Sequence, residues 1–167
     1  MLRDFNWKKL IAVGLLAGLI QVAAGVVMYL AGIYFVPWSM AINLAVLLIC
    51  IVNGGYWYRD SVLKGEISYR QALVVGIVIS VCSGIVYAIY NLVSISFFYP
   101  NFLESTINAR LATVPANERT PELIAAMREG VTAKTIALSN MIRLSLLGSF
   151  LSIFLSFRVK KTADLRG

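Results

Sequence analysis

Charged side chains are missing from long stretches of this chain. Residues 10–58 contain no Asp, Glu, Lys or Arg, and residues 71–103 contain none either. A soluble domain needs charged residues on its surface, whereas a helix of about 20 apolar residues crosses a bilayer once. The first stretch is long enough for two crossings and the second for one. The missing charge therefore predicts an integral membrane protein.

Histidine is absent and cysteine is scarce. Without imidazole, the chain has no histidine general base, no histidine-ligated metal or haem and no histidine pH switch. The two cysteines, Cys50 and Cys82, each lie near the middle of an apolar stretch. We interpret both as reduced, small hydrophobic residues rather than as a disulfide or a metal-binding pair.

Catalytic groups are also lacking. No acidic residue lies within the apolar stretches, and the sequence contains no glycine-rich phosphate loop. Serines are numerous, but the apolar stretches contain no acid or lysine that could act as the base to activate one. We therefore predict that the protein is not an enzyme and has no cofactor and no metal. The missing acids also argue against transport coupled to protons or sodium.

The apolar residues present divide into predicted membrane spans at about residues 10–32, 39–58, 71–98 and 136–157. Pro37 separates the first two because proline cannot continue the hydrogen bonding of a helix. The first apolar run is longer than the 7–15 residues typical of the core of a signal peptide, which favours an uncleaved span. The sequence thus predicts four transmembrane helices.

The segment at about 100–134, between the third and fourth spans, carries two amphipathic patterns. One lies near residues 101–111, and the other follows Thr120, Pro121 and Glu122. A threonine cap, a proline at the first helical position and an acid in the first turn form a typical helix start. The predicted fold is therefore all-α, a single membrane domain over residues 1–167 with an extracytoplasmic helical segment between helices three and four.

Basic residues flank the predicted spans on one side of the membrane. They precede the first span, separate the second from the third and follow the fourth: Arg3, Lys8, Lys9, Arg59, Lys64, Arg70, Arg158, Lys160, Lys161 and Arg166. Such residues favour the cytoplasmic side. We predict that both termini are cytoplasmic and that the 100–134 segment is outside. The net charge of +7 is then a membrane-orienting charge, and no nucleic acid partner is expected.

Small residues form stripes at helical spacing in three of the spans. We predict helix packing through these positions: Gly14, Gly18, Gly25, Gly76, Ser80, Gly84, Ser145, Ser149 and Ser152. Inside lipid, helices associate through close backbone approach and interhelical hydrogen bonds, both of which small residues permit. The stripes can pack the four helices of one chain together, or at least one of them can face a second protein.

A few polar residues fall in the outer half of the predicted spans. They are the members of a possible polar pocket: Asn43, Tyr87, Asn91, Asn140 and Arg143. Arg143 can reach the outer surface or pair with an external acid such as Glu104. Alternatively, these residues together form an outward-facing pocket for an anionic group such as a lipid phosphate.

Two strings of residues resemble a known family. They are Tyr58-Arg59-Asp60 with Gly65-Glu66-Ile67-Ser68-Tyr69, Gln71-Ala72 and Gly76, and then Pro100-Asn101-Phe102-Leu103-Glu104. With four spans in so short a chain, they resemble the family numbered 4199 among the domains of unknown function, a group of small bacterial membrane proteins. The resemblance implies a bacterial inner-membrane location and a four-helix bundle, but no activity and no catalytic residues.

Two functions remain open at this stage. The favoured one is a non-enzymatic protein for helix packing and assembly, or an accessory subunit, acting as a homo-oligomer or with another membrane protein in the lipid bilayer. The alternative is binding or transport of a lipid or small amphiphile through the polar pocket around Arg143.

Overall fold

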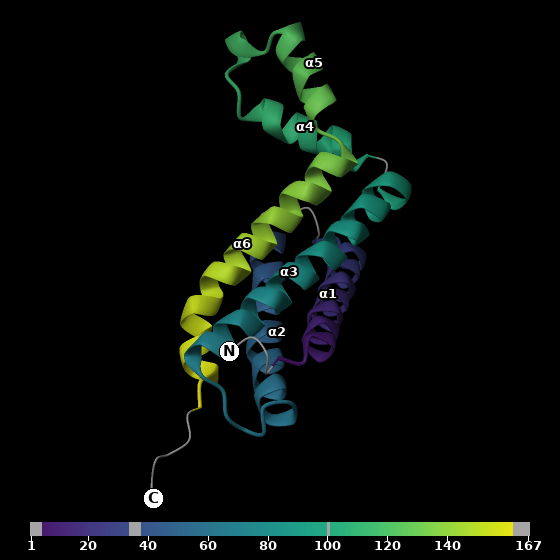
Figure 1. Ribbon diagram of the computed structural model, residues 1–167. Coiled ribbons are helices and arrows are strands. Elements are labelled where there is room, and N and C mark those ends of the chain that lie inside the picture. Colours follow the sequence, from purple (N-terminus) through teal and green to yellow (C-terminus); the bar gives the residue numbers. More distant parts are fainter. Residues whose placement is uncertain (1–4, 34–37, 100, 162–167) are drawn as a thin grey trace, which may run out of the picture. The chain divides into compact units, whose positions relative to one another are not determined.

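The computed structural model describes residues 5–33, 38–99 and 101–161. The long helices are α1, α2, α3 and α6, and the shorter helices are α4 and α5 (Figure 1). The helix bounds are Trp7–Leu30 (α1), Ser39–Ser61 (α2), Tyr69–Val93 (α3), Phe102–Ala112 (α4), Pro121–Gly130 (α5) and Ala133–Val159 (α6). A π-helical turn, Ser94–Phe98, extends α3, and a 3₁₀ turn, Ala116–Glu118, lies between α4 and α5.

Within the described residues, four helices are long and apolar enough to cross a membrane: Trp7–Leu30, Ser39–Ser61, Tyr69–Phe98 and Ala133–Val159. The predicted all-α fold with four candidate spans and a shorter helical segment between spans three and four is confirmed. By helix length and composition, the chain is a multi-pass membrane protein. Pro37, predicted to separate the first two spans, lies outside the described residues, as do Arg3, Pro100 and Arg166.

Three spans begin two to three residues before the predicted positions because polar caps start their helices. Asn6 accepts a hydrogen bond from the Lys9 amide at 3.1 Å at the start of α1. At the start of α3, the Ser68 amide donates to Gln71 Oε1 at 3.0 Å while the Gln71 amide donates to Ser68 Oγ at 3.3 Å. This reciprocal pair is a capping box, which satisfies amides that the first helical turn leaves unpaired.

The contacts divide the chain into two compact units. The first comprises Met1–Tyr87 and Met141–Gly167, and the second comprises Ala88–Asn140. The first unit therefore holds α1, α2 and most of α3 and α6. The second holds α4, α5 and the adjoining ends of α3 and α6.

Glycine and serine alternate across the interface between α3 and α6 in the first unit. A Cβ added at Gly148 would lie 2.5 Å from Ser80 Oγ, and one added at Gly76 would overlap Ser152. Gly84 similarly faces Ser145, whose Oγ would lie 2.6 Å from an added Cβ. Each glycine on one helix thus opposes a serine on the other, so the two backbones approach closely. We call this interface the α3–α6 seam.

Two serine hydroxyls of the seam, those of Ser80 and Ser152, bond to their own helices. Ser80 Oγ donates to the Gly76 carbonyl at 2.7 Å, and Ser152 Oγ donates to the Gly148 carbonyl at 2.7 Å. Serine commonly makes such bonds to the carbonyl four residues earlier in a helix. These two serines therefore contribute to the seam through their small size, since their hydroxyl donors are used within each helix.

The helices α1 and α3 run parallel and in contact. A Cβ at Gly14 would lie 2.6 Å from Cys82 Cβ, and one at Gly18 would lie 2.5 Å from Val86 Cβ. Equal spacing on the two helices fixes their register over this turn. Gln21, three residues after Gly18 on the same buried face, is fully buried.

One end of the first unit is tied together by contacts between distant segments. The Asn6 amide donates to the hydroxyl of buried Tyr58 at 2.9 Å, and the Phe5 ring stacks on Tyr58 with centroids 6.1 Å apart. Ile67 and Lys161 form an antiparallel bridge with bonds of 2.8 and 3.0 Å. The start of α1, the connection between α2 and α3 and the end of α6 therefore meet at this end.

In the second unit, α4 and α5 are joined by an ion pair, Arg128 Nη2 to Glu104 Oε1 at 2.8 Å. The predicted helix start at Thr120 is confirmed, since its hydroxyl accepts from the Leu123 amide at 3.3 Å and Pro121 is the first helical residue. The backbone amide of Glu122 and the Thr120 hydroxyl both lower the pKa of the Glu122 carboxyl.

Candidate functional site

Two residues of the predicted polar pocket are joined by a hydrogen bond within the first unit. Asn43 Nδ2 donates to the Tyr87 hydroxyl at 3.1 Å and to the Ser39 carbonyl of its own helix at 3.1 Å. Asn43 is 7% exposed and Tyr87 is 5% exposed. The pair links α2 to α3 through buried polar atoms.

Buried polar atoms without partners lie on α1 and α2. Neither Gln21 Nε2 nor Gln21 Oε1 has a hydrogen-bond partner, and Asn43 Oδ1 also has none. Because Gly18 faces Val86, the parallel register places Gln21 within about one turn of the level of Tyr87 on α3. Gln21 was not included in the predicted pocket. Its position between Gly18 and Gly25 on the glycine stripe is the sequence signal that could have placed it in the interior.

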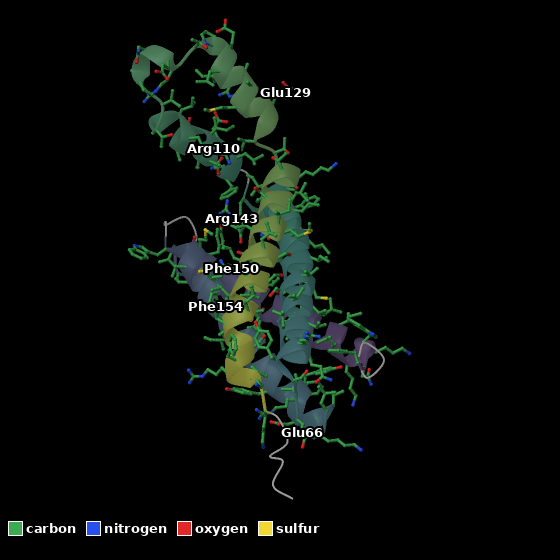
Figure 2. All side chains as sticks on the ribbon, turned by 60° about the vertical axis from the view of Figure 1, so that its left-hand side comes forward. Glu66, Arg110, Glu129, Arg143, Phe150 and Phe154 are labelled. Atoms are coloured by element: carbon green, nitrogen blue, oxygen red, sulfur yellow. The ribbon has the colours of Figure 1, made fainter. Side chains whose placement is uncertain are left out.

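Arg143 is exposed on α6, and Figure 2 shows its place along that helix. Its Nη1 lies 3.3 Å from Met40 Sδ, a weak acceptor on α2. Glu104, considered from sequence as a partner for Arg143, pairs with Arg128. Among the described residues, the guanidinium thus contacts a thioether, and its side chain is exposed.

The other two pocket residues, Asn91 and Asn140, belong to the second unit. Asn91 is 1% exposed, and Asn140 is half-buried. The five predicted residues are therefore divided between the two units, and the described contacts join Asn43 to Tyr87.

A groove of about 750 Å³ lies between α1 and α2, and sequence reasoning did not identify it. One wall comes from α1 and one from α2, at matching helical spacing. Its lining residues are Lys9, Ala12, Val13, Leu16, Ala17 and Ile20 on α1, and Val46, Ile49, Cys50, Asn53, Gly54 and Trp57 on α2. Small residues at Ala12, Ala17 and Gly54 are the signal for it, since they leave space beside the larger side chains.

The described residues place few titratable side chains at these positions. Within the part of the chain that the structure describes, no three His, Cys, Asp or Glu side chains come together to hold a metal ion. Cys50 and Cys82 are free thiols on different helices. What the described residues offer instead is an apolar groove with a lysine at one end and buried amide groups on α1 and α2.

Comparison with known proteins identifies one family. No curated protein and no solved structure matches the chain. The family model described as "Protein of unknown function (DUF4199)" matches residues 12–161. The match covers all four candidate spans except for the first turns of α1. The chain therefore belongs to the DUF4199 family of proteins of unknown function.

Proposed function

We propose that this protein is a non-enzymatic accessory or assembly subunit of the bacterial inner membrane, with both termini in the cytoplasm. The lack of acids in the apolar stretches 10–58, 71–103 and 136–157, and of histidine in the sequence, supports a role without catalysis. Basic residues cluster at both termini and in the connection between the second and third spans, which supports a cytoplasmic location of these segments.

The incomplete burial of the apolar face of α5 is the observation that carries this proposal. This helix has 10 residues, and none of them is buried. Its apolar side chains, Leu123, Ile124 and Met127, lie on one face and are only half covered. An isolated helix shorter than about 12–15 residues is marginal in water, and most helices gain their stability from packing an apolar face. A second protein that covers this face, either another copy or a different membrane protein, would supply that packing.

Five positions of the small-residue stripes pack against other helices of the same chain, so they do not form an association surface for a second protein. In the seam, Gly76, Gly84 and Gly148 face serines of the same chain, and Gly14 and Gly18 face α3. These five positions are therefore occupied within the chain. The proposed partner surface is accordingly the apolar face of α5.

Photo-crosslinking in native membranes tests this proposal. Benzoylphenylalanine is placed at Met127 on the apolar face of α5 or, as a matched control, at Ala125 on the opposite, exposed face. We expect a protein adduct at Met127 that is several-fold stronger than at Ala125, and mass analysis distinguishes a second copy from another protein. Equal adducts at the two positions, or adducts with lipid alone, would contradict a protein partner at α5.

A second function, binding of a lipid or small amphiphile in the outer half of the spans, is favoured by Arg143. Its guanidinium is exposed and, among the described residues, contacts a weak acceptor in the Met40 thioether. The test replaces Arg143 with Gln and measures both co-purified lipid and protein abundance. Loss of bound anionic lipid at normal abundance supports this function, and unchanged lipid content at normal abundance removes it.

A further inference from the structure

The groove between α1 and α2 has a polar end and an apolar end. Lys9 and Trp57 lie at one end, and Ile20 and Val46 lie at the other. From this arrangement we infer that the groove binds an acyl chain of an anionic phospholipid, with the lipid phosphate at Lys9. This site is separate from α5 and from Arg143, so it does not depend on the function proposed above.

The length of the groove matches one leaflet of the bilayer. Lys9 and Ile20 are 11 positions apart on α1, and Val46 and Trp57 are 11 positions apart on α2. At 1.5 Å per residue, each wall is about 16 Å long. Half of a hydrocarbon core of about 30 Å is about 15 Å. The groove thus extends from the surface of one leaflet to the middle of the membrane, as a lipid tail does.

A transmembrane helix from another protein fits this groove less well than a lipid tail does. A helix is about 10–12 Å across with its side chains and crosses the full thickness of about 30 Å. A groove confined to one leaflet would contact only half of such a helix. An acyl chain is thinner and ends near the middle of the membrane, where the groove also ends.

The positive charge of Lys9, at the end of the groove near the membrane surface, favours an anionic lipid. Lys9 is exposed and is the only charged residue among those lining the groove. Trp57, 46% exposed, lies at the same end. Tryptophan is enriched at the membrane–water interface, and a lysine near the surface attracts anionic lipids. A phosphate at Lys9 and a tail along the apolar walls therefore complement the two parts of the groove.

Small residues form the depth of the groove. Ala17 is buried, whereas Leu16 and Ile49 stand at the sides with exposures of 58% and 61%. A Cβ at Gly54 would lie 2.9 Å from Val13 Cγ1, so the two helices touch beneath the groove at this point. The recess is consequently bounded by side chains of both helices and opens to the surroundings.

Quenching of Trp57 fluorescence by brominated lipids tests the site in the full chain. Trp7 and Trp38 are replaced by Phe, which leaves Trp57 as the remaining tryptophan of the three. The protein is placed in phosphatidylcholine vesicles that contain phosphatidylglycerol or phosphatidylcholine brominated in the upper part of the acyl chain, at equal mole fraction. We expect brominated phosphatidylglycerol to bind beside Trp57 about fivefold more strongly, since one surface lysine contributes about that factor.

Two lysine variants separate the site from general surface charge. Lys9→Gln should abolish the preference for phosphatidylglycerol, whereas Lys8→Gln, which removes the neighbouring charge but no lining residue, should keep most of it. Equal quenching by the two lipids in the parent overturns the inference. Loss of the preference to the same extent in both variants also overturns it, because the effect would then come from net charge.

A third variant tests the groove itself. Ala12→Phe places a large side chain in the recess and should lower quenching of Trp57 by both brominated lipids. Circular dichroism and the stability of each variant establish that it remains folded. If a folded Ala12→Phe protein is quenched as strongly as the parent by both lipids, the acyl chain does not occupy the groove, and the inference fails.

Discussion

The α3–α6 seam and the α1–α2 groove both contain small residues, but only the seam is closed. In the seam, Gly76 and Gly148 each face a serine of the opposite helix, and the backbones come together. In the groove, Ala12 and Ala17 leave a recess of about 750 Å³. Small residues that alternate between two helices bring them together, whereas small residues between larger neighbours leave space. The spacing of small residues on one helix therefore does not determine which of these results.

The largest expected effect concerns the seam. In Gly148→Ala, the added methyl would lie 2.5 Å from Ser80 Oγ and 2.9 Å from Leu47 Cδ2. Overpacking of this kind destabilises by about 1–3 kcal/mol. Reversible unfolding in mixed detergent micelles measures the free energy of unfolding. Gly130→Ala is the matched control, because a Cβ at that glycine would enter open space beside the helix.

If Gly148→Ala and Gly130→Ala are equally stable, the seam is looser than the 2.5 Å approach of an added Cβ at Gly148 to Ser80 Oγ implies. A double variant sharpens the test, since Ser80→Gly removes the side chain that the new methyl meets. We expect Gly148→Ala combined with Ser80→Gly to recover part of the lost stability. Two independent losses that simply add would contradict direct contact between these positions.

The next effect in size concerns Gln21, which differs from the seam serines in having no partner for its amide. Burying an unpaired polar group costs about 1–3 kcal/mol. Gln21→Leu removes the amide and keeps a side chain of similar size, so we expect the free energy of unfolding to rise by about 1 kcal/mol. Ser83→Ala, on α3, is the control because its hydroxyl already donates to the Ser80 carbonyl at 3.1 Å.

A decrease in the stability of Gln21→Leu would indicate that the amide binds something in the folded protein. Ordered water commonly satisfies buried polar atoms of this kind. Measurement of the same variant at several osmotic pressures would then distinguish a bound water from a direct contact with the protein.

Much of the fold follows from the sequence because membrane burial leaves a strong signal. The two long uncharged stretches predict three of the four apolar helices, the apolar residues at 136–157 predict the fourth, and the predicted starts differ from the structure by only a few residues. The differences arise at Asn6, Ser68 and Thr132, polar residues that cap helices ahead of the apolar run. A reading of capping patterns together with hydropathy would therefore have located these starts. At the other end of α1, Gly32 has φ of 71°, which explains the earlier helix end, since this backbone conformation terminates helices.

The candidate sites could be predicted only in part, because they depend on which helix faces share an interface. A hydrogen bond links Asn43 to Tyr87, although 44 residues separate them. Prediction of the groove requires the register of α1 against α2. The spacing of residues within either helix does not determine this register. Gln21 is a polar residue within a predicted span, but its burial depends on how α1 packs against α3.

A smaller change in the free energy of unfolding is expected at Ser152, because Ser152→Ala removes a hydrogen bond and adds no volume to the seam. Its hydroxyl donates to the Gly148 carbonyl of its own helix, and that carbonyl also belongs to the helical ladder. Ser152→Ala removes the hydroxyl without adding volume beside Gly76. We expect a change of less than about 1 kcal/mol in the free energy of unfolding. A loss well above this value would show that the hydroxyl also bonds across the seam.

The smallest effect is expected at Ala12, although Ala12→Leu adds more atoms than Gly148→Ala does. Ala12→Leu adds three carbon atoms at an exposed position in the groove, whereas Gly148→Ala adds a single carbon in the seam. We expect Ala12→Leu to change the free energy of unfolding by no more than about 0.5 kcal/mol, as is usual for surface substitutions. Measurement of both variants in the same micelles compares the two interfaces directly. If Ala12→Leu destabilises as much as Gly148→Ala, the helices α1 and α2 close on each other and the groove is not a stable space. If only Gly148→Ala destabilises, the positions of small residues relative to the facing helix, and not their number, determine whether an interface is closed or open to a ligand.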